Sequence, residues 1–130
     1  MSFVVRKLKK GDHIRVKRSF YFHHGLYIGN NEVIHYTGEV SDSIDNPSEV
    51  KVRITSIDFF KKEGIVEAYN PTLKERLLYT KRRNKRIKEA KMLLGENNYN
   101  FLHNNCEDFV NRVSYKKKLT SQIDDLKKKI

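Results

Sequence analysis

The spacing of apolar residues changes halfway along the 130-residue chain, and this change restricts the fold more than any other feature. Before residue 70, apolar and polar side chains alternate in residues 14–17 and 50–55, which is the pattern of strands with one buried face. After residue 71 the apolar residues recur at helical spacing. Strands followed by helices predict the α+β class, with an antiparallel sheet packed against helices.

The first half contains a predicted β-hairpin. Residues 22–28 and 33–36 flank Gly29-Asn30-Asn31, a triplet whose residues favour tight turns. Residues 37–48 have turn composition without an apolar period and predict a surface loop. Residues 64–69 predict one further strand.

Three helical segments are expected in the second half. The first ends at Gly95 as its cap, with Ile87 and Ala90 on its apolar face. Its opposite, basic face comprises Lys81, Arg82, Arg83, Lys85, Arg86, Lys88 and Lys91. Residues 104–113 predict a second helix, with Cys106 in its first turn. Residues 114–130 are expected to carry a C-terminal basic amphipathic helix, whose apolar residues are Leu119, Ile123, Leu126 and Ile130.

Composition limits the chain further. Its length predicts a single domain over residues 1–130 with a core of about residues 11–113. The net charge of +11 attracts nucleic acid or an anionic membrane without specificity. A single cysteine excludes an intramolecular disulfide and a zinc site made of several thiolates. Neither a signal peptide nor a membrane-spanning run is recognisable, so we expect an intracellular protein.

The single cysteine is the candidate nucleophile. A helix start lowers the pKa of a thiol through its unpaired amides and its dipole, and Cys106 lies at such a start. It also lies on the apolar stripe of that helix, so the sulfur faces the body of the domain, where a base on the sheet could reach it. The alternative is that Cys106 is a small buried hydrophobic residue, which is common for free cysteine.

The candidate bases are the five histidines, His13, His23, His24, His35 and His103. His23 and His24 are adjacent on a strand and point to opposite faces, so only one of them can share a site with Cys106. His13 and His103 have no comparable partners and are expected to be structural.

The register of the hairpin decides the position of the next histidine. A two-residue turn sets His35 opposite Leu26, on the face of His24. A three-residue turn sets it opposite Gly25, beside His23, where the missing side chain lets two imidazoles approach diagonally. The sequence leaves both registers open. These histidines are equally compatible with a structural role in partly buried strands.

Two motifs resemble the lecithin:retinol acyltransferase-like (LRAT-like) family. The "H-box" of that family is similar to residues 22–29 (FHHGLYIG) and 33–35 (VIH). Its "NC" motif is similar to residues 105–110 (NCEDFV). The resemblance extends over residues 11 to about 113, which is almost the whole domain. Two residues depart from the family pattern: His24 replaces an aromatic residue, and Asp108 replaces a histidine found in many members.

The resemblance implies a circularly permuted papain-like fold, related to the NlpC-type cysteine peptidases, with the cysteine at a helix N-terminus. Cys106 matches the nucleophile, His23 the base and His35 the histidine that orients the base. The backbone amide of Cys106 is a candidate donor to the oxyanion. The implied enzyme is a cysteine acyltransferase or acyl hydrolase of phospholipase A type, which forms an acyl-cysteine thioester. No cofactor and no metal are expected.

Phospholipid is the acyl donor that the resemblance favours. Residues 81–91 and the C-terminal helix could attract an anionic membrane to the protein, and any binding of nucleic acid would be nonspecific. A catalytically silent basic module that binds RNA, membrane or a protein is the alternative from another class. A cysteine amidase or peptidase that acts on an intracellular amide bond is a further alternative.

Overall fold

The computed structural model describes residues 2–41, 49–97, 107 and 109–114. Its strands are β1 (Phe3–Val4), β2 (His13–Lys17), β3 (Phe22–Gly29), β4 (Glu32–Thr37), β5 (Lys51–Ser56) and β6 (Val66–Tyr69). Its helices are α1 (Ile57–Lys61), α2 (Leu73–Lys81) and α3 (Arg83–Met92), and residues 107 and 109–114 are also helical.

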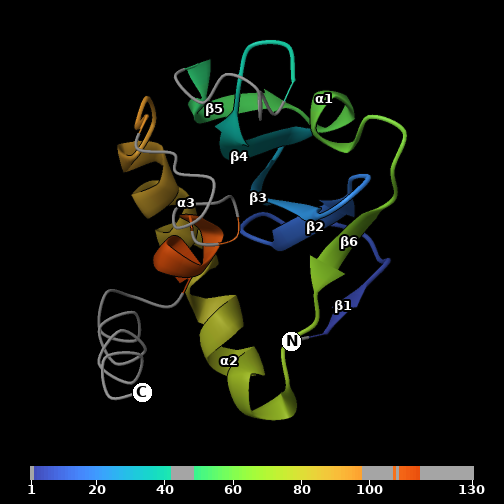
Figure 1. Ribbon diagram of the computed structural model, residues 1–130. Coiled ribbons are helices and arrows are strands. Elements are labelled where there is room, and N and C mark those ends of the chain that lie inside the picture. Colours follow the sequence, from blue (N-terminus) through green and yellow to red (C-terminus); the bar gives the residue numbers. More distant parts are fainter. Residues whose placement is uncertain (1, 42–48, 98–106, 108, 115–130) are drawn as a thin grey trace, which may run out of the picture.

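The strands form one antiparallel sheet in the order β1-β6-β2-β3-β4-β5 (Figure 1). Helix α3 and residues 109–114 pack on one face, where they share a core with Leu26 and Ile34. Helix α1 covers the other face, where Phe60 shares a second core with Val33. Because both faces are covered, both sides of β3 and β4 carry buried residues. The α+β class and the sheet packed against helices are confirmed.

Most predicted strands are present. The segments predicted over residues 14–17, 22–28, 33–36, 50–55 and 64–69 correspond to β2, β3, β4, β5 and β6. Strand β1 and helix α1 were not predicted, because so few residues show no measurable period. Part of the predicted surface loop, residues 42–48, lies outside the described residues, as does the predicted C-terminal helix beyond residue 114.

The helix predicted to end at Gly95 is two helices that meet at Arg82. Arg82 is both the C-cap of α2 and the N-cap of α3. Helix α3 ends at Met92, and Gly95 follows with a φ of +87°, a conformation that favours glycine. The amide of Gly95 then donates to the carbonyl of Val52, so the chain returns to the edge strand β5.

The predicted basic face of this segment is wrong for its arginines. Arg86 has an exposed fraction of 0% and donates from Nε to the carbonyl of Gly11 and from Nη1 to that of Tyr79. Arg82 is also buried and donates to the carbonyl of Ser114. The exposed cations are the lysines, Lys81, Lys85, Lys88 and Lys91. A planar guanidinium can serve several backbone carbonyls at once, whereas an ammonium group stays in water.

Arg83, the third arginine of this segment, binds Asp12 just before β2 and so holds α3 against the sheet. Both Arg6 and Arg83 donate to the buried carboxylate of Asp12, and so does the amide of Lys9. Burial alone would raise the pKa of Asp12, but the hydrogen bonds from Arg6 and Arg83 outweigh it and hold that pKa below its usual value. A Cβ on the preceding residue, Gly11, would lie 2.7 Å from the carbonyl oxygen of Arg83, so only glycine lets α3 approach this closely.

None of the helices in the described segments combines the length and the apolar character required to cross a bilayer.

We predict that Arg86→Ala lowers the free energy of unfolding by about 3 kcal/mol, because two buried carbonyls lose their donor and the ring of Tyr79 loses a stacked cation. A urea titration measures the change. Lys85→Ala, at an exposed position of the same helix, is the matched control and should leave the unfolding midpoint nearly unchanged. Equal midpoints for the two variants would contradict a structural role for Arg86.

Candidate functional site

Two buried histidines from neighbouring strands form a hydrogen-bonded pair. Nε2 of His23 in β3 lies 2.8 Å from Nδ1 of His35 in β4. Their exposed fractions are 2% and 0%. The ring of Phe60 from α1 lies against both imidazoles, with centroids 5.2 Å from His23 and 5.1 Å from His35. Both histidines are therefore held in place on the α1 face of the sheet.

A β-bulge makes this pairing possible. The turn itself has two residues, because Gly29 pairs with Glu32. The register then shifts between Tyr27 and Gly29, so that Leu26 pairs with Ile34. The next step along the ladder sets His35 opposite Gly25, as the three-residue alternative describes. The register of the second alternative is thus reached with the turn of the first, because the bulge adds one residue in β3.

Gly25 leaves the space that the pair needs. A Cβ at this position would lie 2.7 Å from Cγ1 of Val33, 2.8 Å from Cε2 of Phe60 and 3.2 Å from Cβ of His35. Real Cβ atoms do not approach other heavy atoms as closely as the first two distances, so a side chain here would displace the residues that hold the imidazoles.

Thr55 in β5 is the next hydrogen-bonding partner of the pair. Its hydroxyl lies 3.1 Å from the carbonyl oxygen of Ser56 and 2.8 Å from Nε2 of His35. A hydroxyl that donates to the carbonyl accepts from the imidazole, and in that arrangement Nε2 of His35 carries the proton and its Nδ1 accepts. Nε2 of His23 would then be the donor between the two rings, with Nδ1 of His23 unprotonated. Sequence reasoning missed Thr55, because only the strand order brings β5 beside His35.

A second histidine pair lies on the opposite face of the sheet. Nε2 of His13 is 2.7 Å from Nδ1 of His24, which corrects the expectation that His13 has no partner. Burial is the main reason that the pKa of His24 falls to about 3, with smaller contributions from the charges of His23 and Arg15. Burial also holds the pKa of His13 well below its usual value. Both rings are therefore neutral near pH 7.

The helix predicted to carry the cysteine packs as expected in its described part. Phe109, Val110 and Val113 are buried on the face of Leu26 and Ile34. Farther along the helix, Arg112 donates to Glu96 at 2.6 Å, which ties this helix to the segment after α3.

Cys106 itself, and with it the predicted oxyanion donor, lies outside the described residues. The neighbouring Glu107 is described, and its Oε2 is 3.8 Å from Nε2 of His24. This part of the helix therefore lies close to His24, on the face of β3 opposite to the one that carries His23. Among the described residues, no three His, Cys, Asp or Glu side chains are grouped as metal ligands would be.

Comparison with protein families shows which family the chain belongs to. The model of the lecithin retinol acyltransferase family matches residues 6–119. The chain belongs to this family. Membership confirms the resemblance seen in the two motifs and implies a papain-like fold for the domain. The permutation of that fold stays a prediction.

Curated relatives of the family are similar to this chain at low identity. Lecithin retinol acyltransferase of Mus musculus is 24% identical over 143 residues, which cover 94% of this chain and 61% of the mouse enzyme. The Homo sapiens enzyme of that name is 25% identical over 136 residues, covering 88% of this chain and 58% of the enzyme. Phospholipase A and acyltransferase 4 of Homo sapiens is 29% identical over 135 residues, which cover 92% of this chain and 77% of that protein. The chain thus spans less than two thirds of the length of the lecithin retinol acyltransferases that it matches.

We predict that Thr55→Val changes the tautomers of the histidine pair, because it removes the hydroxyl that accepts from His35 while keeping the side-chain volume. The imidazole ¹⁵N chemical shifts of His23 and His35 report which nitrogens are protonated. Thr55→Ser keeps the hydroxyl and should give the wild-type shifts. If Thr55→Val also gives them, Thr55 does not order the protons.

Proposed function

We propose that the chain is a cysteine acyltransferase or acyl hydrolase that takes an acyl group from a phospholipid. His23 removes the thiol proton of Cys106, and the resulting thiolate attacks the ester carbonyl and forms a carbon–sulfur bond. The carbon–oxygen bond to the glycerol then breaks, and the leaving alkoxide takes a proton from His23. Water, an amine or an alcohol attacks the resulting thioester, His23 removes the proton of that acceptor, and the thiolate is released.

The observation that carries this proposal is the 2.8 Å contact between His23 and His35. A base needs one nitrogen for the proton that it moves and a partner on the other nitrogen that fixes the ring. With Thr55 ordering the protons, Nδ1 of His23 is the basic nitrogen and Nε2 donates to His35. In this proposal His35 is the orienting histidine, which contacts the base rather than the substrate.

His24 is the competing base, because it lies on the face of the helix that follows Cys106. Its pKa of about 3 argues against it, since such a weak base removes a proton poorly near neutral pH. Its contact with Glu107 joins a neutral imidazole to a carboxylate, which suits a residue that holds the start of a helix. His23 is therefore the base in the proposed mechanism.

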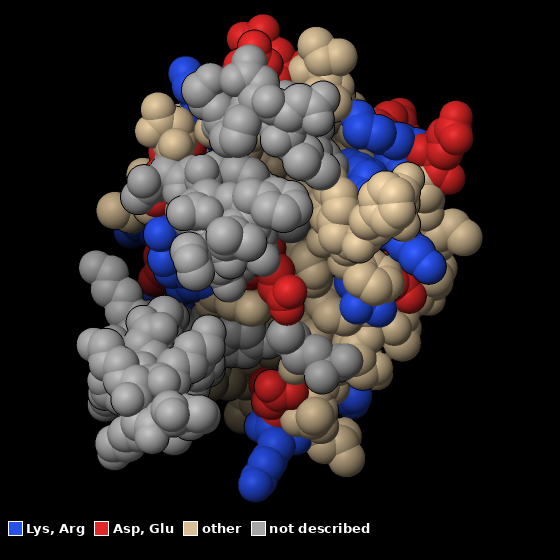
Figure 2. Space-filling view, in the orientation of Figure 1, with Lys and Arg blue, Asp and Glu red and all other residues tan. Residues whose placement is uncertain are grey.

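We further propose peripheral contact with anionic lipid through the exposed lysines of α2 and α3. Leu73 and Leu77, with exposed fractions of 84% and 74%, lie one turn apart on α2, and Lys74 and Lys81 share that exposed side of the helix. On the face seen in Figure 2, basic and acidic side chains are interspersed among uncharged ones, so the described residues there form no continuous basic patch. The contact is accordingly weak and sensitive to salt.

We predict that iodoacetamide labels Cys106 faster than a model thiol at about pH 6.5, and that His23→Ala slows labelling about tenfold. The matched control is the neighbouring variant His24→Phe, which restores the aromatic character usual in the family and should keep at least half of the wild-type rate. A loss of labelling rate in His24→Phe alone would instead assign the base to the pair of His13 and His24.

We also predict an acyl adduct on the wild-type protein after incubation with short-chain phosphatidylcholine vesicles. Intact-protein mass spectrometry should show the adduct, hydroxylamine should remove it, and Cys106→Ser should never form it. If neither adduct nor free fatty acid appears with several lipids, the catalytic proposal fails. Vesicle or RNA binding that falls with salt and persists in Cys106→Ser would then favour the binding module.

A further inference from the structure

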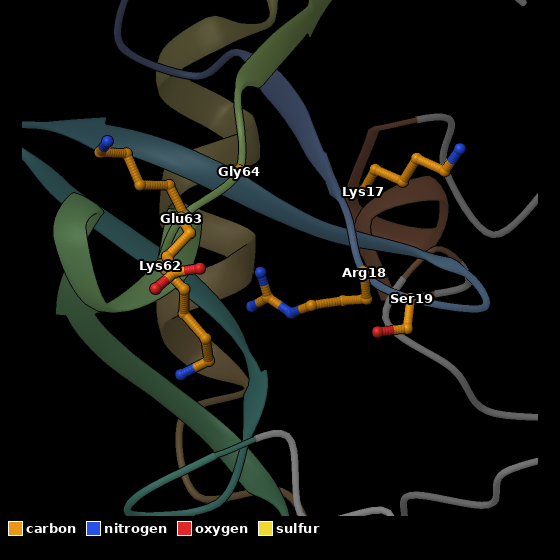
Figure 3. Close-up of a pocket in the computed structure, with 7 residues that line it drawn as sticks. Lys17, Arg18, Ser19, Lys62, Glu63 and Gly64 are labelled. Carbon is orange, nitrogen blue, oxygen red and sulfur yellow. The ribbon is translucent and has the colours of Figure 1, made fainter.

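A basic hollow lies where the β2–β3 turn meets the residues that follow α1 (Figure 3). Its volume is about 470 Å³, and its lining residues are Lys17, Arg18, Ser19, Lys61, Lys62, Glu63 and Gly64. The two segments that form it are in close contact, because a Cβ on Gly64 would clash with Cγ2 of Val16. The hollow is therefore built from two fixed segments of the described fold.

The lining is suited to an anion. Four of its seven residues are lysine or arginine and one is acidic, Glu63. In Figure 3 the side chain of Arg18 extends from its turn toward the segment of Lys62 and Glu63, whereas Lys17 points away from Arg18. Nη2 of Arg18 donates to the carbonyl of Phe60 at 2.7 Å, so its guanidinium is held in one orientation across the hollow. A guanidinium offers N–H donors in a fixed arrangement that matches the oxygens of a phosphate.

The hollow adjoins the histidine pair through Phe60. The carbonyl of this residue holds Arg18, and its ring packs against His23 and His35. The strand pairing agrees, because Val16, the residue before Lys17, lies opposite His23. Phe60 and Val16 thus both connect the lining of the hollow to the surroundings of the proposed base.

An exposed aromatic side chain stands at the same turn. Phe20 has an exposed fraction of 98% and follows Ser19 directly. An apolar ring beside cationic groups is the combination that favours the boundary between lipid head groups and acyl chains. The turn therefore offers one contact for the charged part of a lipid and one for its apolar part.

We propose that this hollow binds the phosphate group of the acyl donor and so places the ester of a glycerophospholipid at His23. The inference rests on the proposed function for its substrate. Arg18 and the ammonium groups of Lys61 and Lys62 contact the phosphate oxygens, and Phe20 enters the lipid surface.

The first test measures binding without turnover. In the Cys106→Ser protein, dihexanoyl-phosphatidic acid and inorganic phosphate are titrated separately, and the backbone amide shifts of Ser19 and Gly64 are followed by NMR. We expect both amides to shift with the lipid, and a shift with inorganic phosphate as well would identify free phosphate as a second source of the same group. Dihexanoylglycerol, which has no phosphate, should leave them unchanged. No shift with either phosphate compound, or an equal shift with dihexanoylglycerol, would overturn the proposal.

The second test measures selectivity in the active protein. Lys61→Gln combined with Lys62→Gln should raise KM for a short-chain phospholipid about fivefold while kcat stays within twofold, and hydrolysis of a neutral p-nitrophenyl ester should not change. Lys7→Gln combined with Lys51→Gln removes the same charge at exposed positions away from the hollow and from α2 and α3, and should change KM less than twofold. Equal effects of the two double variants would show general attraction by charge and overturn the site. Because NMR binding needs no turnover, failure of the acyl chemistry would be distinguishable from failure of this site.

Discussion

The β-bulge between Tyr27 and Gly29 is the constraint on which the candidate site depends. Side chains on a strand alternate between faces, so a slip of one residue would carry His35 to the face of Leu26 and away from His23. The two-residue turn alone gives that slipped register, and the extra residue in the bulge reverses it. Gly25 then admits the diagonal contact between the imidazoles. One inserted residue thus brings His35 beside His23, the base of the proposed mechanism.

The two histidine pairs have different hydrogen-bond partners and charges around them. Desolvation lowers the pKa of His13 and of His24, and nearby positive charge, including that of Arg15, adds to the effect. The pair formed by His23 and His35 instead ends on the hydroxyl of Thr55. Two similar contacts on opposite faces of β3 therefore favour different roles, one in holding the fold and one in moving a proton.

The sequence allowed the hairpin, the strand segments and the buried stripe of Phe109, Val110 and Val113 to be predicted, because each has a clear period. It could not choose the register of His35, because a bulge leaves no mark in the spacing of apolar residues. Thr55 could not be found either, since its contact with His35 requires the order of strands in the sheet. These failures all concern contacts between segments distant in sequence, which local patterns do not encode.

Net charge alone did not predict what this protein binds, because several of its arginines bind groups of the protein itself. A formal charge of +11 suggests a broadly basic surface, yet Arg82 and Arg86 serve carbonyls in the interior and Arg83 serves Asp12. The planar guanidinium presents several N–H donors in a fixed arrangement that fits such acceptors, whereas the ammonium groups of the lysines lie in solvent. The attraction to anionic lipid proposed for those lysines would be diffuse and screened by salt. Selective recognition of a phosphate needs a cation that is already oriented, and Arg18, fixed by the carbonyl of Phe60 beside the histidine pair, meets that requirement.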